Sequence, residues 1–542
     1  KSPNITSTSE YKGYILGTEI KNINKNIDDL KKQIEIIETC YKGAHGYLGD
    51  AMSSSNAYKG KRNILIQIEN VENTLSKSKE IIDLSTTNKE KQDVIRDIWT
   101  SLLIDAVALL KMNDTREKIH LEREKEENKE NLKPIFEVFN KTRRTSSYGV
   151  EEIVTYFDDF IDYESVLYGM NKHYRDHKKH VLQVWALGVY LINKIENDGY
   201  NIYLNDSYKA KPIEFQFTPT NKFFTEKSEG VLVTQSEQWA MWTIIALCHD
   251  LGYPIEKTSQ INKQAKKIIL HFGSMQFTEL DYSFSLLNTY LIKKFLNIIS
   301  SRVDYSEDVE KTDKSGKMIK VSTYKTTVQE KYKDKLSKSL EDFKHGIFSS
   351  LLLYKNLTYF LETDYNSGDR SKPLYKEDAR QFYLRKEILR SIAGHTCPKL
   401  YHIRLDTLAF LLILCDELQE WNRPKSENLL YFTKEEIPKV KIKEFQIGNM
   451  SNDTVRVSMN YGIPCSKEHR KHIVLSRFKN IHYLLRSGKD DYDRSFVFEW
   501  EISFKDVEFN FLYNSTQPSY EQLIVKEKNL DSGEEKEITL YE

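Results

Sequence analysis

A chain of 542 residues with 80 lysines and arginines against 80 aspartates and glutamates has no overall charge to attract nucleic acid or an anionic membrane. Its length suits about two to four domains. It holds no apolar run close to the roughly 20 residues that span a bilayer. The five cysteines are scattered and odd in number, and no signal-peptide pattern opens the sequence, so we expect a reducing, cytoplasmic setting.

Residues 1–135 are predicted to be helical. Apolar residues recur at steps of three and four from Ile20 to Tyr41 and from Ile64 to Ile82, which is typical of coiled-coil seams. A third helix is expected around Val94–Leu110. Two interpretations stay open, an oligomerising or sensor coiled coil and a helical bundle packed on the rest of the chain. Further apolar positions outside the seams favour a homo-oligomer through these helices.

The central residues, 136–427, contain five apolar helical stretches that each bring an ionisable side chain to their apolar side. In one of them, the buried pattern from Trp239 to Ala246 leads to His249 and Asp250, just before Gly252. A charged group in such a place costs several kcal/mol unless it is paired or bound to a metal. One such histidine has a structural explanation, but five helices together predict a shared metal site. The side chains are His180, His249, Asp250, His345, His395 and Asp416.

Two insertions interrupt the central helices. Residues 197–235 contain alternating stretches that predict short strands, and residues 301–338 are charged, with possible strands around MIKVSTYKTTV. Insertions of this kind commonly form rims or lids over a site. The lysines of the second insertion are mixed with acidic residues, which favours a solvated loop over a phosphate site.

Residues 428–542 are predicted to form a small α+β domain. Three stretches alternate at period two, which indicates strands, and the run from Cys465 to Gly488 between them indicates a helix. Its HRKH segment is better explained as a basic helix face than as a metal or nucleic-acid patch.

The order of the ligand-type residues resembles the HD superfamily of metal-dependent phosphohydrolases. The resemblance covers roughly residues 170–425, over the segments HKKHVLQV, LCHDLGYP, FKHGIFSSLLL, IAGHT and LLILCDELQEWNRP. It implies a mainly α protein with a central, all-helical HD-type domain. By position, His180, His249, Asp250 and Asp416 match the ligands common to the superfamily. His345 and His395 match the two extra histidines of members that hold two metals. Tyr253 departs from the pattern, because many members have a lysine there.

This ligand chemistry suits one or two divalent transition metals. Imidazoles and carboxylates together favour Mn, Fe, Zn, Co or Ni over an all-oxygen Mg or Ca site, although Mg stays a candidate. Two metals held about 3.5–4 Å apart, with Asp250 as the bridge, suit an in-line displacement at phosphorus. His177 lies one turn before His180, and we expect it to donate a proton or contact phosphate. The candidate phosphate-binding cations are Arg175, Lys257, Arg404 and Arg423.

We therefore expect an enzyme that hydrolyses a phosphoester or phosphoanhydride bond, foremost in a nucleotide, with metal-activated water. Within the superfamily, a cyclic-nucleotide phosphodiesterase and a single-strand nuclease are alternatives, and zero net charge disfavours the nuclease without excluding nucleic acid. A non-catalytic nucleotide-binding signalling module and a helical scaffold with satisfied core histidines are alternatives from other classes. The expected partner is a phosphate-containing small molecule, and no membrane is expected.

Overall fold

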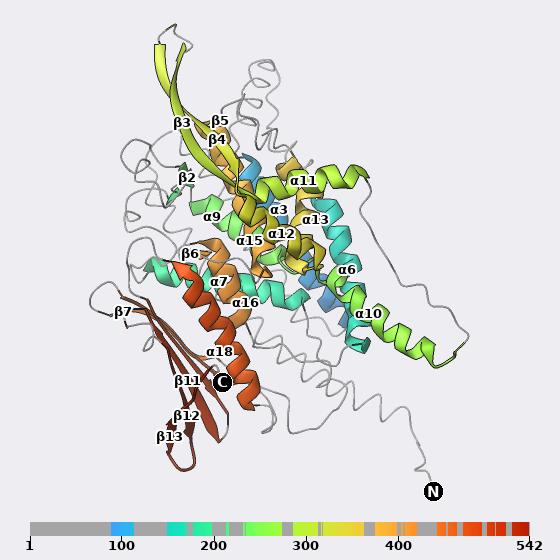
Figure 1. Ribbon diagram of the computed structural model, residues 1–542, viewed down its shortest axis with the longest axis vertical. Helices are drawn as coiled ribbons and strands as arrows, with labels where there is room; N and C mark the ends of the chain where they lie inside the picture. The colour runs from blue at the N-terminus through green and yellow to red at the C-terminus, as the bar shows by residue number, and fades with distance from the viewer. Residues whose placement is uncertain are drawn as a thin grey trace. The chain divides into compact units, whose positions relative to one another are not determined.

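The computed structural model describes part of the chain (Figure 1). The described residues are 88–112, 149–170, 177–197, 213–215, 231–233, 235–273, 286–312, 316, 318–361, 374–397, 403–404, 407–419, 442–450, 454–462, 470–489, 496–504, 506–515, 517 and 523–540. The chain divides into two compact units, Lys1–Leu102 and Leu103–Glu542. The strands and the residues of the predicted metal site all belong to the second unit.

Helices dominate the described residues, as the sequence predicts for a mainly α protein. Those of the central region are α6 (Val150–Met170), α7 (Lys178–Asn197), α9 (Gln235–Cys248), α10 (Tyr253–Leu270), α11 (Leu286–Ser300), α12 (Glu330–Glu341), α13 (His345–Asn356), α14 (Thr358–Leu361), α15 (Lys376–His395) and α16 (Leu408–Leu418). None of the described helices combines the length and the apolarity that a membrane crossing needs.

Part of the core of the central region forms where α7 packs against α9. Trp185 and Trp242 are both buried, and the Trp242 indole N–H donates to the carbonyl of Trp185 across the helix pair. Gly188 permits this approach, because a Cβ atom there would lie only 1.9 Å from the Trp242 ring. All residues of α9 from Ala240 to Cys248 are buried, and Trp239 just before them is partly exposed. The helix pair therefore forms a rigid support for residues placed at its ends.

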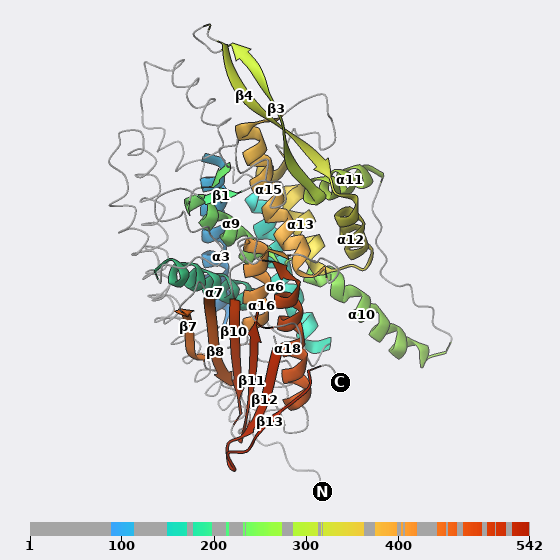
Figure 2. The ribbon, with the colours of Figure 1, turned by 60° about the vertical axis from the view of Figure 1, so that its left-hand side comes forward.

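Both predicted insertions contain strands. β1 (Ile213–Phe215) pairs with β2 (Val231–Val233) in the first insertion. In the second, β3 (Ser301–Thr312) and β4 (Met318–Val328) form a long antiparallel hairpin, and β5 (Leu374–Tyr375) adds a short third strand. Figure 2 shows this hairpin extending away from the helices. The possible strands predicted around MIKVSTYKTTV are therefore confirmed as an ordered hairpin, in place of the solvated loop that the charges favoured. β-Branched residues, which favour strands, recur along β4.

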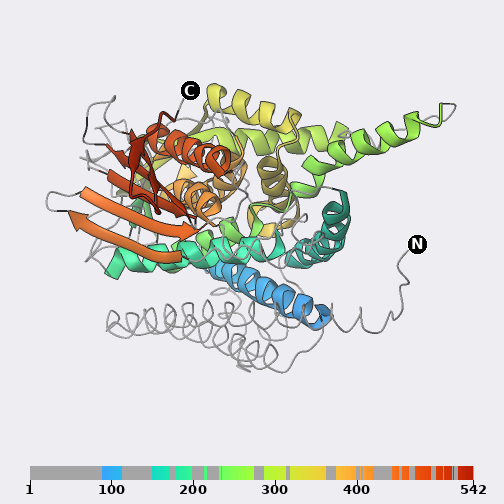
Figure 3. The same cartoon turned by 90° about the horizontal axis from the view of Figure 1, so that it is seen from below.

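The C-terminal region is a six-stranded mixed sheet with one helix, as predicted for an α+β domain. The sheet order is β13-β12-β11-β10-β8-β7, with β10 parallel to β8 and the other neighbours antiparallel. Phe478 of the helix packs against Trp500 and Phe511 of the sheet, with ring centroids 5.6 and 5.1 Å away. The elements are β7 (Ile442–Met450), β8 (Thr454–Gly462), α18 (Arg470–Ser487), β10 (Phe496–Ser503), β11 (Val507–Asn514), β12 (Leu523–Asn529) and β13 (Glu535–Glu537) (Figure 3).

The C-terminal helix also contacts the central helices. The Asn480 amide on α18 donates to the Glu417 carboxylate on α16 at 3.4 Å. Two short parallel strands, β6 (Ile403–Arg404) before α16 and β9 (Gly488–Lys489) after α18, also pair with each other. The helix that ends in the predicted ligand Asp416 therefore lies against the C-terminal region.

Only one element of the predicted N-terminal region is described. This is α3 (Asn88–Met112), which overlaps the expected third helix. Both predicted coiled-coil seams lie outside the described residues, so the coiled coil and the homo-oligomer stay predictions.

Candidate metal centre

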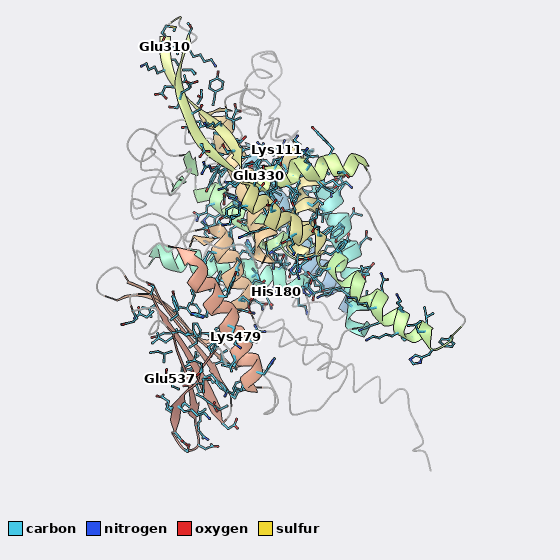
Figure 4. The ribbon with its side chains drawn as sticks, in the orientation of Figure 1. Lys111, His180, Glu310, Glu330, Lys479 and Glu537 are labelled. Carbon is cyan, nitrogen blue, oxygen red and sulfur yellow. The ribbon has the colours of Figure 1, made fainter. Side chains whose placement is uncertain are left out.

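Each predicted ligand lies at or near the end of a helix. His180 is in the first turn of α7, His345 is the first residue of α13, and His395 is the last residue of α15. His249 and Asp250 form the turn after α9, and Asp416 is in the last turn of α16. Figure 4 labels His180 among the central helices. The structure brings all six side chains into one cluster, in which three overlapping groups have ligand atoms within 4.8 Å of one another.

The Asp250 carboxylate lies between two pairs of histidines. Its Oδ2 atom is 3.4 Å from His249 Nε2 and 3.7 Å from His180 Nε2. Its Oδ1 atom is 3.2 Å from His345 Nε2 and 3.8 Å from His395 Nε2. One carboxylate thus presents one oxygen to each pair, which is the arrangement of a ligand that bridges two ions.

Asp416 lies beside the first pair of histidines, His180 and His249. Its Oδ1 atom is 2.8 Å from His180 Nε2 and 3.9 Å from His249 Nε2. The first group therefore has two imidazoles and two carboxylates, whereas the second has two imidazoles and the shared Asp250. Both compositions suit a divalent transition metal better than Ca²⁺.

All four histidines use Nδ1 for a hydrogen bond that points away from the cluster. His249 donates to the carbonyl of Ala246 at 2.8 Å, and His395 donates to that of Ile392 at 2.7 Å. The other two acceptors are side chains: Glu256 for His345, at 2.7 Å, and Gln419 for His180. With the proton on Nδ1, the lone pair of each neutral imidazole is on Nε2 and faces the other ligands, as in metal sites.

Two features of the histidine Nε2 atoms suit a bound cation. His249 is completely buried, and its Nε2 atom has no hydrogen-bond partner among the described residues. The Nε2 atoms of His345 and His395 lie 3.2 Å apart, so in the neutral forms two lone pairs face each other. Burying an acceptor without a donor is costly, and a metal ion supplies the missing positive charge. The residues present therefore fit one or two metal ions.

The electrostatics of the cluster keep its carboxylates charged. Burial raises the pKa of Asp250, but His249 and the hydrogen bonds from His345 and His395 outweigh it and hold that pKa well below its usual value. Burial opposes ionisation of Asp416 too, but His180 and His249 lower its pKa well below the ordinary range. Burial also lowers the pKa of His395, which favours the neutral imidazole that a metal needs.

His249 and His345 are more basic than usual in the metal-free protein. Burial lowers the pKa of His249, but Asp250, Asp416 and the hydrogen bond to the Ala246 carbonyl outweigh it and raise that pKa. The pKa of His345 is raised too. Burial disfavours its charged form, but hydrogen bonds to Asp250 and Glu256 prevail and raise its pKa to about 9. Glu256 has the complementary change, because burial is outweighed by His345 and its pKa falls to about 2. The two side chains form an ion pair, and His345 must give up a proton to bind a metal through Nε2.

The turn before α13 places His345 by an unusual backbone conformation. α12 ends with the Phe343 N–H donating to the carbonyl of Leu340 and the Lys344 N–H donating to that of Ser339, a Schellman motif. Phe343 has φ of 52°, a left-handed conformation that glycine usually adopts at this place. Its ring stacks on Phe348 with centroids 5.8 Å apart, a contact that offsets the backbone cost.

The other predicted site residues have different outcomes. His177 is buried and lies beside the cluster, with its ring centroid 6.3 Å from that of His180 and 3.9 Å from that of Tyr253. Lys257 lies near it, with Nζ 4.6 Å from the Tyr253 ring centroid and 3.5 Å from Glu256. For Arg404 only the backbone, in β6, is described, while Arg175 and Arg423 lie outside the described residues.

Three residues that support the cluster were not predicted. Glu256 and Gln419 orient His345 and His180, and Gln419 in turn donates to Gln183 at 2.7 Å. Glu164 on α6 is buried and accepts the backbone N–H of His177 at 2.6 Å. The only sequence signal for Glu256 is its place soon after His249–Asp250, in the first turn of α10. Glu164 gave no such signal, because α6 carries several other carboxylates.

Comparison with known proteins adds no further assignment. No protein-family model matches the chain, and neither a curated protein nor a solved structure matches it. The case for its function therefore depends on the geometry of the six ligand-type side chains and on the residues that orient them.

Proposed function

We propose that the chain is a metal-dependent phosphohydrolase of the HD type. The observation that carries the proposal is that four Nε2 atoms and two carboxylates converge, while every Nδ1 is hydrogen-bonded on the outside. His180, His249, Asp250 and Asp416 would hold one ion, and Asp250, His345 and His395 a second. When bound, such ions polarise a phosphoryl oxygen and lower the pKa of a water molecule.

The chain's own residues supply binding and proton transfer around these ions. Lys257 lies beside Glu256 and Tyr253, where its ammonium group can bind a phosphoryl oxygen. His177 lies between Glu164 and Tyr253, with Nδ1 3.6 Å from the Glu164 carboxylate. From this place His177 would donate a proton to the leaving oxygen or bind phosphate. The substrate is a phosphoester or phosphoanhydride, foremost in a nucleotide.

The test compares the full chain with Asp250→Asn. Both proteins are loaded with Mn²⁺, Fe²⁺ or Zn²⁺ and given bis(p-nitrophenyl) phosphate and a panel of nucleotides. We expect the wild type to bind metal and hydrolyse at least one substrate. Asp250→Asn should lose bound metal and about 1000-fold or more in rate, since metal ions supply several kcal/mol.

A substitution at an exposed residue far from the centre in sequence is the control. Asp531→Asn, a substitution at an exposed carboxylate in the β12–β13 turn, should leave metal content and rate unchanged. A wild-type protein without bound transition metal, or an Asp250→Asn protein with the wild-type rate, would falsify the proposal. The first result would favour a helical scaffold with structural histidines. Metal binding with no hydrolysis of any substrate would favour the non-catalytic nucleotide-binding module.

A further inference from the structure

Two helices near the candidate metal centre carry long stretches with several cations and no carboxylate. In α10, four lysines follow Glu256 with no acidic residue among them: Lys257, Lys263, Lys266 and Lys267. From residue 470 to residue 489, α18 and β9 contain six cations and no acidic residue: Arg470, Lys471, Arg477, Lys479, Arg486 and Lys489. In a chain with no net charge, these are local concentrations of positive charge.

α10 connects the centre to lysines far from it. Its first residues belong to the site, because Tyr253 lies against His177 and Glu256 binds His345. At a rise of 1.5 Å per residue, Lys266 lies about 20 Å along the helix axis from Tyr253. Lys263, Lys266 and Lys267 are exposed there, and Figure 1 shows α10 extending away from the other central helices. A mononucleotide held at the centre does not reach these lysines.

α18 contacts α16, the helix that carries the predicted ligand Asp416. Asn480 binds Glu417, which is the neighbour of the predicted ligand Asp416. Towards its beginning, α18 exposes Lys471 and His472. After its end, the β6–β9 pair places Arg404 opposite Lys489 in register. α18 therefore adds exposed positive charge of its own at Lys471.

Both cationic helices also carry an exposed aromatic ring. Phe272, just after α10, is 65% exposed, and Tyr483 on α18 is 49% exposed. Tyr483 lies three residues from Asn480, on a neighbouring part of the helix surface. Cations that follow a phosphate backbone, combined with aromatic rings on which bases stack, are the recognition chemistry of single-stranded nucleic acid.

We infer that the substrate of the proposed hydrolase is a single-stranded nucleic acid that binds along α10, crosses the centre and continues along α18. The inference rests on the proposed function. It assigns the distant lysines a role that a mononucleotide does not give them. The ligands His180 and Asp250 are buried, so a flexible single strand reaches them more easily than a duplex does. An anionic membrane would suit the end of α10, with its exposed Ile268 and Leu270, but would leave the cations of α18 unexplained.

Binding without hydrolysis tests the inference. Full-length Asp250→Asn protein is titrated into a fluorescein-labelled 20-nucleotide oligothymidine over a series of salt concentrations, and anisotropy gives the affinity. Each lysine that contacts a phosphate contributes about 0.7 to the slope of log K against log salt. We expect the slope to fall by about 1.4 in Lys263→Gln/Lys267→Gln and again in Lys471→Gln/Lys479→Gln. The pair Lys320→Gln/Lys325→Gln, on β4, is the matched control and should not change it.

The aromatic residues give a separate measurement. Phe272→Ala and Tyr483→Ala should each weaken binding about fivefold or more at an unchanged salt slope, because stacking is not ionic. A thermal melt of each variant checks that its fold is intact. The lysine variants, made in the wild-type background, should keep the rate on bis(p-nitrophenyl) phosphate and lose cleavage of the oligonucleotide.

The contrary outcomes separate this inference from the proposed function. If the protein hydrolyses the small ester but does not bind oligothymidine, the inference is wrong and the phosphohydrolase stands. Equal losses in the test and control pairs, or binding to phosphatidylserine vesicles in place of oligothymidine, also overturn it. Lysine-dependent binding of oligothymidine by a protein that hydrolyses nothing would support the nucleic-acid surface and overturn the hydrolase.

Discussion

Gln419 shows how one residue outside the ligand set controls a ligand. It is completely buried, accepts a hydrogen bond from His180 Nδ1, and is itself fixed by Gln183. These two hydrogen bonds determine which nitrogen of His180 carries the proton, so that Nε2 faces Asp416 and Asp250.

Replacing Gln419 should therefore weaken metal binding without removing a ligand. We expect Gln419→Leu to lower metal affinity about 10- to 100-fold, because the imidazole loses the acceptor that fixes its tautomer. Competition with a metallochromic chelator measures the affinity. Gln264→Leu, at an exposed position on α10, is the matched control. Unchanged affinity in Gln419→Leu would mean that His180 does not bind the metal.

The raised pKa of His345 predicts a pH dependence. In the metal-free protein, the pKa of His345 is about 9, above the ordinary 6.5. Protonated His345 therefore stabilises the folded state fully below pH 6.5. This contribution to the free energy of unfolding disappears as the pH rises through about 9. A metal at Nε2 must displace it, so metal affinity should rise up to tenfold per pH unit below pH 9. Calorimetry in buffers of different ionisation enthalpy should detect about one released proton at pH 7. Binding that releases no proton would contradict this assignment.

At the scale of the helices, Gly346 sets the distance between two ligand-bearing elements. A Cβ atom there would lie 2.6 Å from the Ile392 carbonyl oxygen and 2.8 Å from His395 Nδ1. Because α13 carries His345 and α15 carries His395, the absence of a side chain lets their two Nε2 atoms approach each other.

Gly346→Ala should separate these two ligands. We expect a loss of roughly 1–3 kcal/mol in the free energy of unfolding, from overpacking, together with loss of the second metal ion. Denaturant melts and metal analysis measure the two effects. Gly188→Ala, which would meet Trp242, carries a comparable packing cost between other helices and should keep the His345–His395 pair intact. Two ions bound per chain in Gly346→Ala would disprove the role of this glycine.

The six ligand-type side chains of the cluster could be predicted from the sequence, whereas the residues that support them could not. Each ligand is an ionisable group beside an apolar helical pattern, and such a conflict is visible in one segment. Glu256 and Gln419 act through partners 89 and 239 residues away, and no local pattern records that pairing. The left-handed Phe343 was equally hidden, because a glycine normally marks such a turn.

At the scale of the whole molecule, a net charge of zero does not describe how the charges are distributed. It disfavoured nucleic acid in the sequence, yet the described helices divide the charges unevenly and leave α10 and α18 positive. The α+β region and the mainly helical character were predictable from periodicity. The lengths of β3 and β4 were not, since charged, alternating segments also suit a solvated loop.

Metal removal should destabilise the whole second unit, because five elements share the centre. With free metal at 100 times its Kd, the free energy of unfolding should be about 2.7 kcal/mol higher than in the metal-free protein. Thermal melts with and without a chelator measure the difference. Asp250→Asn is the control, since a chelator should not change its melting temperature. Equal melts of the wild type with and without chelator would show that no metal binds to the folded state.

The wide separation of the ligands in sequence has a consequence for how the protein is made. His180 and Asp416 are 236 residues apart, and the other four ligands lie between them. At about 5–20 residues per second, a ribosome needs roughly 10–50 s to pass from the first ligand to the last. During that time the nascent chain holds unassembled imidazoles that cannot form the complete centre. The complete proposed metal centre would thus form only after Asp416 has been synthesised, and a metal ion would stabilise a chain that has already brought α7 and α16 together.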